Sequence, residues 1–192
     1  MRAIILAAGR GSRLAPLTDD RPKPLVDVLG RSLLLRTLDR LREVGIDDRA
    51  VVIVTGYRAE MIEAVMRREG LRCELVLNPR WHDWNNFYSL LVARAAMRGE
   101  AFLQFDGDVV FDAQVLPRML ARRDEAALAV ELQPDMGAEP MKVVVGDDGY
   151  LRELSKTLDP ARAIGEYIGI TRIDAGTGEI LFADLARFEA EG

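Results

Sequence analysis

The sequence predicts an α/β protein of Rossmann-like architecture, in which a mostly parallel sheet carries helices on both faces. Short apolar runs rich in β-branched residues alternate with segments whose apolar residues recur at helical spacing. The connections between successive strands are long enough to hold a helix, as crossovers between parallel strands require. Right-handed crossovers then place a ligand site at the carboxyl ends of the strands.

The expected elements follow in order along the chain. Strands are expected at 3–7, 51–54, 73–77, 101–105 and 127–132. Helices are expected at 34–44, 61–66, 87–97 and 115–121, where apolar side chains recur every three or four positions. Ser32 is a candidate N-cap of the first helix, and Gly45 stands just past its end.

The last third of the chain has a looser pattern. Two short apolar runs, 142–145 and 150–151, flank an Asp-Gly turn and predict a β-hairpin. A strand at 164–171 and a final helix at 180–188 should follow. We expect the hairpin region to form a lid or a substrate subdomain. The length of 192 residues fits one domain spanning residues 1–192.

Composition excludes several classes of protein. Apolar residues make up 49% and charged residues 30%, a balance typical of folded globular proteins. The net charge of −5 argues against broad nucleic-acid binding. No apolar run approaches a membrane span, the first apolar run is too short for a signal peptide, and Cys73 is the sole cysteine. We therefore expect a cytoplasmic protein without disulfide or membrane contact, whose oligomeric state the sequence leaves open.

The loop after the first strand combines two glycines with two cations. Gly9 and Gly11 permit positive φ and can turn successive N–H groups toward an anion. Arg13 offers a planar fork to phosphate oxygens, and Lys23, flanked by a proline on each side, offers a point charge. The spacing fits neither a dinucleotide fingerprint nor a Walker loop. A glycine-rich turn with solvated charges would explain the two glycines alone, but not their combination with Arg13 and the proline-flanked Lys23.

This string, LAAGRGSRL at 6–14 followed by Pro-Lys-Pro at 22–24, resembles the signature of the sugar-phosphate nucleotidyltransferases. The resemblance implies that the glycine loop holds the triphosphate of a nucleotide. It also implies that Arg13 and Lys23 are catalytic residues that neutralise charge during transfer. The loop residues implied in nucleotide binding are Ala7, Ala8, Gly9, Gly11, Ser12 and Arg13.

A second motif, Asp106-Gly107-Asp108, stands where the fourth strand should end. Carboxylates suit Mg²⁺, a hard ion that binds a few of them together with phosphate oxygens and water. The resemblance implies that Asp108 is the metal ligand, with Asp106 as a weaker candidate that belongs to the nucleotide site. Taken alone, the motif also fits a turn that merely ends a strand.

A third segment, residues 78–90, places four of the twelve aromatic residues within eight positions. It resembles the corresponding stretch of bacterial phosphocholine cytidylyltransferases. Trp81, Asp83 and Trp84 are candidates for a cage around an ammonium head group, where cation–π contacts contribute roughly 0.5–2 kcal/mol each. Asn86 and Ser89 are candidate readers of a pyrimidine edge. The alternative, that Trp84 and its neighbours pack a helix into the core, stays open.

Three charged residues near the end of the chain complete the pattern: Lys142, Lys156 and Glu166. They resemble the acceptor half of cytidylyltransferases that act on phosphocholine, aminoethylphosphonate or similar compounds. The lysines are candidates for the acceptor phosphate and Glu166 for its positive head group, while solvated surface charge is the alternative for each lysine. We accordingly expect an NTP-binding half at about 1–110 and an acceptor half at about 111–192.

The resemblance runs from Met1 to about Arg172. Relatives carry a second metal-binding aspartate farther on, whereas only Asp174 and Asp184 remain here, and neither lies in the family motif. We therefore expect the acceptor half to be shortened and the second metal ligand to be missing or replaced.

Together these features predict a Mg²⁺-dependent transfer of CMP from CTP to a small phosphorylated amino-alcohol, with release of pyrophosphate. The acceptor oxygen is already anionic at pH 7, so alignment and charge neutralisation suffice. One alternative is a sugar-1-phosphate nucleotidyltransferase that uses another NTP. A second alternative is a nucleotide-binding module with impaired catalysis.

Overall fold

The computed structural model describes residues 1–84, 86–132, 137 and 139–191. The chain forms two compact units, one made of Met1–Ala127 with Thr171–Gly192 and the other of Leu128–Ile170. Strands β7 (Ala126–Glu131) and β10 (Gly165–Ile173) run from one unit into the other.

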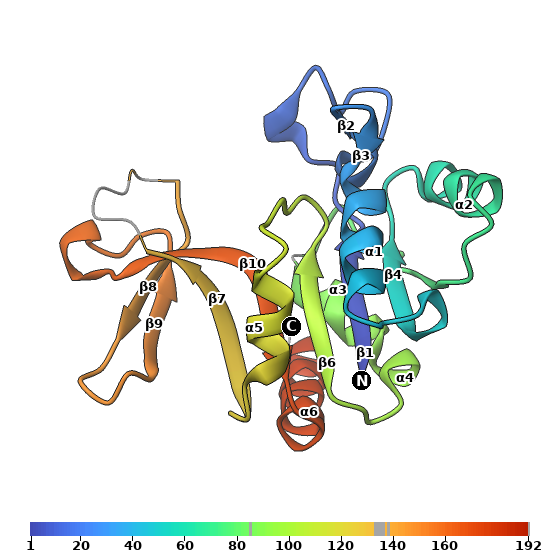
Figure 1. The fold of residues 1–192 in the computed structure, drawn as a ribbon. Coiled ribbons are helices and arrows are strands. Elements are labelled where there is room, and N and C mark those ends of the chain that lie inside the picture. The colour runs from blue at the N-terminus through green and yellow to red at the C-terminus, as the bar shows by residue number, and fades with distance from the viewer. Residues whose placement is uncertain (85, 133–136, 138, 192) are drawn as a thin grey trace. The chain divides into compact units, whose positions relative to one another are not determined.

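The first unit is built on four parallel strands in the order β5-β4-β1-β6 (Figure 1). Their bounds are Arg2–Ala7 for β1, Val51–Thr55 for β4, Glu74–Leu77 for β5 and Phe102–Asp106 for β6. Strands β1 and β4 are buried on both faces, as near-continuous apolar runs predict for a parallel sheet. The predicted fold class, mixed α/β with a mostly parallel central sheet and flanking helices, is confirmed.

The helices of this unit match most of the predicted ones. Their bounds are Leu33–Glu43 for α1, Ala59–Arg68 for α2, Asn86–Val92 for α3, Arg94–Met97 for α4, Val115–Ala121 for α5 and Ala175–Glu191 for α6. Ser32 caps α1 as expected, since its Oγ accepts from the Leu35 amide at 3.4 Å. Among the described residues, each helix is too short or too polar to cross a membrane.

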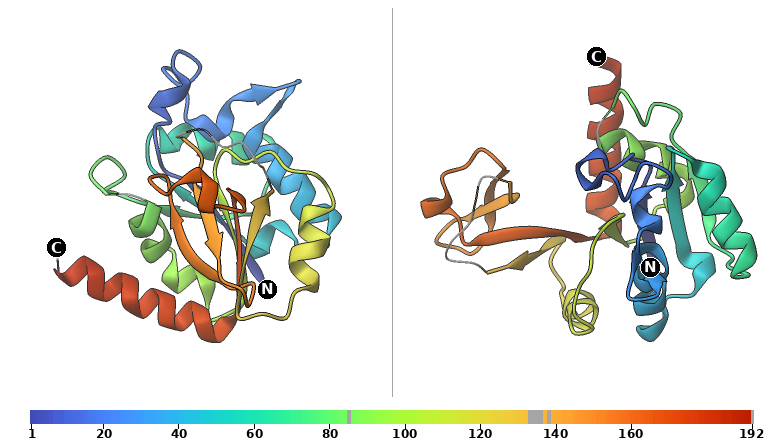
Figure 2. Two further views of the ribbon diagram at one scale, coloured as in Figure 1. Left: turned by 90° about the vertical axis from the view of Figure 1, so that its left-hand side faces the viewer. Right: turned by 90° about the horizontal axis from the view of Figure 1, so that it is seen from above.

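The path of the chain puts helices on both faces of the sheet. Strands β1, β4 and β5 follow one another toward one edge, so right-handed crossovers put α1 and α2 on the same face. The chain then returns to place β6 on the other side of β1, which puts α3 and α4 on the opposite face. In Figure 2, α1 and the pair of α3 and α6 lie on opposite sides of the sheet.

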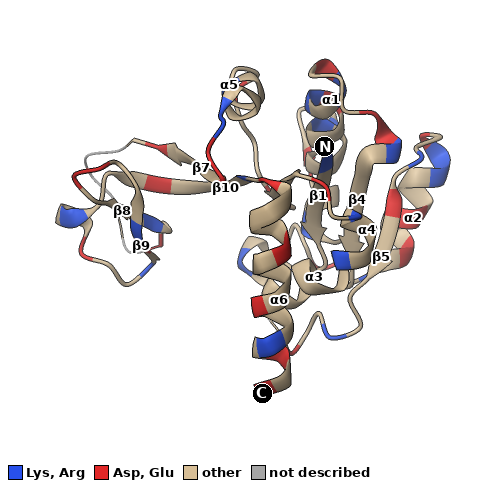
Figure 3. Ribbon diagram, turned by 90° about the horizontal axis from the view of Figure 1, so that it is seen from below, with Lys and Arg blue, Asp and Glu red and all other residues tan. Residues whose placement is uncertain are grey.

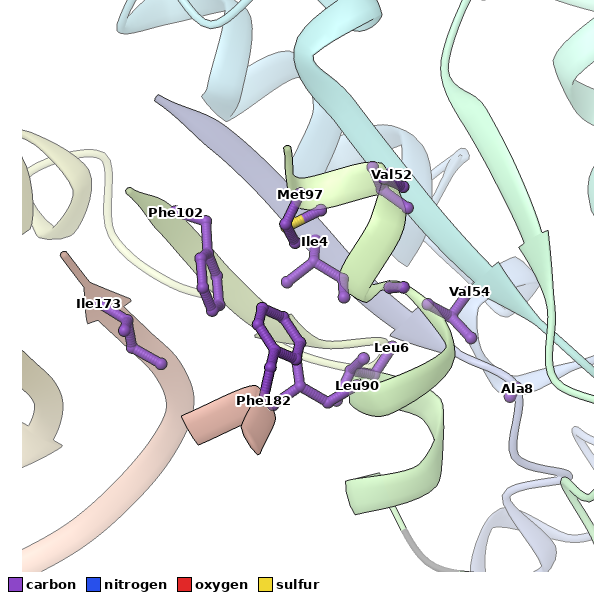
Figure 4. Packing of buried hydrophobic residues seen from close by; sticks show 12 residues of the cluster. Ile4, Leu6, Ala8, Val52, Val54, Leu90, Met97, Phe102, Ile173 and Phe182 are labelled. Carbon is purple, nitrogen blue, oxygen red and sulfur yellow. The ribbon is translucent and has the colours of Figure 1, made fainter. Parts of the chain in front are cut away.

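The core on the α3 face joins sheet and helices in one apolar cluster (Figure 4). Phe102 of β6 stacks on Phe182 of α6 with ring centroids 5.8 Å apart. Leu90 and Met97 fill the space between these rings and β1. Burial of such side chains contributes roughly 1.5–3 kcal/mol each, so α6 is held mainly by packing. Its outer face mixes acidic and basic residues (Figure 3).

Two predicted elements differ from the structure. The helix expected at 87–97 is two helices, separated at Ala93. The helix expected at 180–188 begins at Ala175, because Asp174 caps it by accepting from the Thr177 amide at 2.7 Å. Glycines at 176 and 178 weaken helix propensity and hid this first turn from sequence reasoning.

One small element was not predicted. Strands β2 (Asp27–Val28) and β3 (Arg31–Ser32) form a two-stranded ribbon. Leu29 and Gly30 join them with φ values of 52° and 78°. Positive φ at both turn positions matches the tight hairpin turn that joins twisted strands.

The second unit contains the predicted hairpin. Strands β8 (Lys142–Val145) and β9 (Leu151–Ser155) pair antiparallel, and Gly149 takes a φ of 78° in the Asp-Gly turn. The start of β10 pairs antiparallel with β8, so that Glu166 lies opposite Lys142.

Candidate active site

The loop after β1 folds back on itself in two short 3-10 turns, Ser12–Leu14 and Lys23–Leu25. Thr18, which is 1% exposed, donates its hydroxyl to the Gly11 carbonyl at 2.9 Å and fixes the loop from inside. The second turn of the loop begins at Lys23. Pro22, directly before it, has the extended backbone that suits this position.

Gly11 is required by a close approach of Lys23. Its φ is 72°, and a Cβ at this position would lie 2.7 Å from the Lys23 Cβ. The stem of Lys23 therefore packs directly on the Gly11 backbone, which limits where its ammonium group can point. The expectation of positive φ holds for Gly11 and not for Gly9, whose φ lies outside the left-handed region.

The second motif lies at the end of β6. Asp106 is the last residue of the strand, and Gly107 then passes close to β1. A Cβ on Gly107 would meet the Leu6 carbonyl oxygen at 2.6 Å and Pro24 Cγ at 2.9 Å. This close approach brings Asp108 next to the Lys23 turn.

Lys23 and Asp108 form an ion pair between the two motifs, with the ammonium group donating to Asp108 Oδ2. The side chains are 21% and 35% exposed, so the pair is open to solvent on one side. The two side chains neutralise one another's charge.

A pocket of about 260 Å³ lies over this pair. It is lined by Leu6, Ala7, Gly9, Gly11, Arg13, Lys23, Pro24, Asn86, Asp106, Gly107 and Asp108. The loops that bound it follow β1 and β6, the neighbouring strands between which the direction of chain progression reverses. In open parallel sheets this reversal is where ligands bind. The structure thus brings Arg13, Lys23 and Asp108 to one pocket at the carboxyl edge of the sheet.

Asp106, like Asp108, is a half-buried carboxylate of the pocket lining. Burial, and next the neighbouring charge of Asp108, raise the pKa of Asp106 to about 6, while Lys23 acts in the opposite direction. Asn86 lies beside it, with Nδ2 3.4 Å from Asp106 Oδ1. The pocket is therefore lined by two carboxylates, an amide and two cations.

Ser89 lies away from this lining. It is 4% exposed, and its Oγ accepts from Asn78 Nδ2 at 2.9 Å. Its hydroxyl oxygen is engaged inside the protein, and contact of Ser89 or Asn86 with a pyrimidine edge stays a prediction.

The aromatic candidates belong to two ring clusters of the first unit. Trp81 lies against Tyr57, with ring centroids 5.3 Å apart, and also packs on the core. Trp84 contacts Tyr88 at 5.2 Å, and the Arg80 guanidinium lies 5.0 Å from its ring centroid. The Arg80 guanidinium thus already lies against the half-buried Trp84 ring, which packs on neighbouring rings of α3.

Asp83 is exposed and pairs with His82 at 3.1 Å. A cage formed by Trp81, Asp83 and Trp84 stays a prediction.

The acceptor candidates gather within the second unit. Lys142 is 1% exposed, and its Nζ donates to the Lys156 carbonyl at 2.7 Å and to the Pro140 carbonyl at 3.4 Å. Lys156 itself is exposed, with Nζ 3.3 Å from Glu139. Glu166 is half-buried, opposite Lys142 in the ladder. Lys142 therefore supports the backbone at Lys156, and its burial does not fit the alternative of a solvated surface charge. Its role toward the acceptor phosphate stays a prediction.

Comparison with known proteins identifies the family. The model of the MobA-like NTP transferase domain matches residues 3–167. The chain belongs to this family.

Several relatives of this NTP transferase domain are cytidylyltransferases. The chain is 37% identical over 172 residues to the CMP-5'-(3-aminopropyl)phosphonate synthase of Streptomyces rubellomurinus, covering 87% of this chain and 26% of that protein. It is 39% identical over 106 residues to the choline-phosphate cytidylyltransferase of Streptococcus pneumoniae, covering 55% and 44% respectively. The chain thus spans less than half the length of these two relatives.

A solved structure of the CTP:phosphocholine cytidylyltransferase from Streptococcus pneumoniae has the same fold. It superposes with a TM-score of 0.75 at 27% identity, over 100% of this chain and 78% of that one.

Sequence reasoning missed two residues that shape the site of this NTP transferase domain. Gly107 was expected only as part of a turn, whereas its missing side chain lets β1 and Pro24 approach. Asn78 is fully buried at the end of β5 and was not a candidate. The signal that could have found it is an asparagine directly before a proline at the end of a predicted strand, a position that favours side-chain bonds to local backbone.

The two late aspartates considered as metal ligands have other contacts. Asp174 caps α6, and this bond to the Thr177 amide is the main cause of its lowered pKa. Asp184 is exposed and pairs with Arg187 at 3.0 Å.

Proposed function

We propose that this chain transfers CMP from CTP to a small phosphorylated amino-alcohol of the phosphocholine or aminoethylphosphonate type, releasing pyrophosphate. The observation that carries the proposal is the pocket that Arg13 and Lys23 line together with Asp106 and Asp108. Cations that can grip a polyphosphate, next to carboxylates that can hold a metal ion, are what phosphoryl transfer needs.

The nucleotide is held by the first part of the chain, residues 1 to about 110. The backbone from Ala7 to Ser12 lies along its phosphates, with Arg13 and Lys23 paired to the β- and γ-phosphates. Asn86 faces the pyrimidine edge, because an amide offers both a donor and an acceptor.

The reaction is an in-line displacement. An anionic oxygen of the acceptor phosphate or phosphonate forms a new bond to the α-phosphorus of CTP. The bond from that phosphorus to the oxygen bridging the α- and β-phosphates breaks, and its electron pair leaves on pyrophosphate. No proton is transferred, so the pocket needs no general base. Arg13 and Lys23 stabilise the charge that develops on the leaving group.

The carboxylates of Asp106 and Asp108 fit a magnesium ion. Among the described residues, no three acidic, histidine or cysteine side chains form a ready-made metal cage. Mg²⁺ does not require one, because it usually combines one or two carboxylates with substrate phosphates and water. When bound there, it supplies positive charge that polarises the α-phosphate.

The acceptor is held by the second part of the chain, about 111–192. The exposed ammonium group of Lys156 is available for the acceptor phosphate once it leaves Glu139. Glu166 is the candidate partner of the positive head group. The aromatic segment with Trp81, Asp83 and Trp84 is a second candidate for that head group.

A panel of substrates tests the proposal. Purified protein with Mg²⁺ is offered CTP with phosphocholine, CTP with aminoethylphosphonate, and UTP or dTTP with glucose-1-phosphate, and pyrophosphate release is measured. We expect release only in the CTP arms. Release confined to the sugar-phosphate arms would identify a sugar-1-phosphate nucleotidyltransferase instead, and nucleotide binding without release in any arm would indicate a binding module.

A further inference from the structure

Asn78 joins three separate parts of the first unit through hydrogen bonds. Its backbone amide donates to the Thr55 carbonyl at the end of β4, at 2.8 Å. Its Oδ1 accepts from the Arg80 amide at 2.8 Å, which shapes the turn after β5. Its Nδ2 donates to Ser89 Oγ on α3, at 2.9 Å. The whole residue is 0% exposed.

The bond to Ser89 ties α3 to the end of β5. Asn86 is the first residue of α3, and Ser89 lies one turn farther along. Leu90 anchors the helix to the core through an apolar contact, which carries no hydrogen-bond direction of its own. The hydrogen bond at Ser89 supplies such a direction and helps to set the place of Asn86 beside Asp106.

We propose that Asn78 is a positioning residue for nucleotide recognition: through Ser89 it holds Asn86 at the pocket wall. The inference rests on the proposed function, because it assigns Asn86 to the nucleotide base. Asn78 contacts no pocket-lining side chain in the bonds given above, so its influence passes through α3.

Asparagine suits this position for a chemical reason. The site needs one acceptor for the Arg80 amide and one donor for the Ser89 hydroxyl on the same short side chain. An amide supplies both without charge, whereas a carboxylate would be an ion buried at 0% exposure.

The experiment is a double-mutant cycle read by binding of CTP and UTP in titration calorimetry. The variants are Ser89→Ala, Asn86→Ala and the two combined. Ser89→Ala is preferred to Asn78→Ala because it removes one Asn78 bond and leaves the bond to the Arg80 amide in place. Thr37→Ala is the matched control, since Thr37 is 4% exposed and bonds to Leu33 in α1 at 3.2 Å, outside the pocket lining.

We expect Ser89→Ala to weaken CTP binding about fivefold, as loss of one ordering hydrogen bond predicts, and to reduce the preference for CTP over UTP. Asn86→Ala should weaken CTP binding at least as much. The combined variant should bind no more weakly than Asn86→Ala alone, because Ser89 acts through Asn86. Thr37→Ala should lower the unfolding temperature and leave CTP affinity unchanged.

Three results would overturn the inference. If Ser89→Ala leaves CTP affinity unchanged, the bond between Asn78 and Ser89 is purely structural. The same holds if Thr37→Ala weakens CTP binding as much as Ser89→Ala does. Effects of Ser89→Ala and Asn86→Ala that multiply in the combined variant would show that they act independently. Absence of nucleotide binding in the unmodified protein would instead refute the proposed function, and this inference with it.

Discussion

Lys23 and Asp108, 85 residues apart in the sequence, form an ion pair in the pocket between the loops after β1 and β6. Both partners have another role in the proposed reaction: Lys23 neutralises phosphates, and Asp108 holds a metal ion. A divalent cation and the Lys23 ammonium group therefore compete for one carboxylate until a nucleotide arrives.

This competition predicts opposite effects of Lys23→Met on two ligands. Without nucleotide, Mn²⁺ should bind the variant more tightly than the unmodified protein, because a neighbouring positive charge has been removed. CTP should bind the variant roughly ten- to hundredfold more weakly, since a charge-assisted contact is lost. Electron paramagnetic resonance of free Mn²⁺ and calorimetry with CTP measure the two affinities. Mn²⁺ binding that weakens in Lys23→Met would contradict the competition.

A second prediction concerns the close approach at Gly107. Gly107→Ala places a methyl group 2.6 Å from the Leu6 carbonyl oxygen, so it should destabilise the protein by about 1–3 kcal/mol and reduce turnover. Gly176→Ala is the control, because its methyl group meets only ordinary contacts at 3.7 Å and lies in α6. A helical glycine replaced by alanine should stabilise by about 0.5–1 kcal/mol. Urea unfolding measures the change in unfolding free energy for both variants. Equal changes of the same sign in Gly107→Ala and Gly176→Ala would refute the steric argument.

A third prediction separates the two lysines of the second unit. Lys142→Met leaves the carbonyls of Lys156 and Pro140 without their buried donor, so stability should fall by about 1–3 kcal/mol. Lys156→Met should leave stability nearly unchanged, because its side chain is exposed and its ion pair is a surface pair. The Lys156→Met variant should have a higher KM for the acceptor and an unchanged KM for CTP. The reverse pattern, in which only Lys142→Met changes the acceptor KM, would assign the acceptor contact to Lys142 and not to Lys156.

A fourth prediction concerns Cys73. Burial, and next the charge of Asp48, raise the pKa of its thiol to about 12 from a reference of 9.0. The native thiol should therefore react far more slowly with Ellman's reagent at about pH 8 than the thiol in urea-unfolded protein.

The same shift fixes the sign of a pH effect on stability. An unfolded chain loses this proton near pH 9, whereas the native protein keeps it until near pH 12. The stability that Cys73 contributes is fully present below pH 9 and is lost as pH rises toward 12. The difference in unfolding free energy between the unmodified protein and Cys73→Ala should follow this trend. A difference that stays constant across this range would contradict the pKa assignment.

Much of the fold could be predicted from the sequence because its signals are local. Buried strands such as β1 and β4 are apolar except for Arg2 at the start of β1 and Thr55 at the end of β4, and Ser32 caps α1 with its own side chain. The start of α6 was missed because two glycines mask a helix that Asp174 caps and Phe182 anchors to the core.

The candidate site also contains residues that the sequence predicts and contacts that it does not. Arg13, Lys23 and Asp108 were predicted from motifs, and they share a pocket because the carboxyl ends of neighbouring parallel strands meet at one edge. The bonds of Lys142 and Ser89 could not be predicted. Each depends on which long-range neighbour the folded chain brings near: a backbone carbonyl for Lys142 and the Asn78 amide for Ser89.

The central claim is that this pocket joins CMP to a phosphorylated acceptor. The most direct test is ³¹P nuclear magnetic resonance of the protein incubated with Mg²⁺, CTP and phosphocholine or aminoethylphosphonate. We predict that the acceptor phosphorus signal is replaced by a pair coupled through a new P–O–P bond while pyrophosphate accumulates, and that Lys23→Met forms this product far more slowly. An acceptor signal that stays unchanged with both acceptors, while the protein demonstrably binds CTP, would contradict the account.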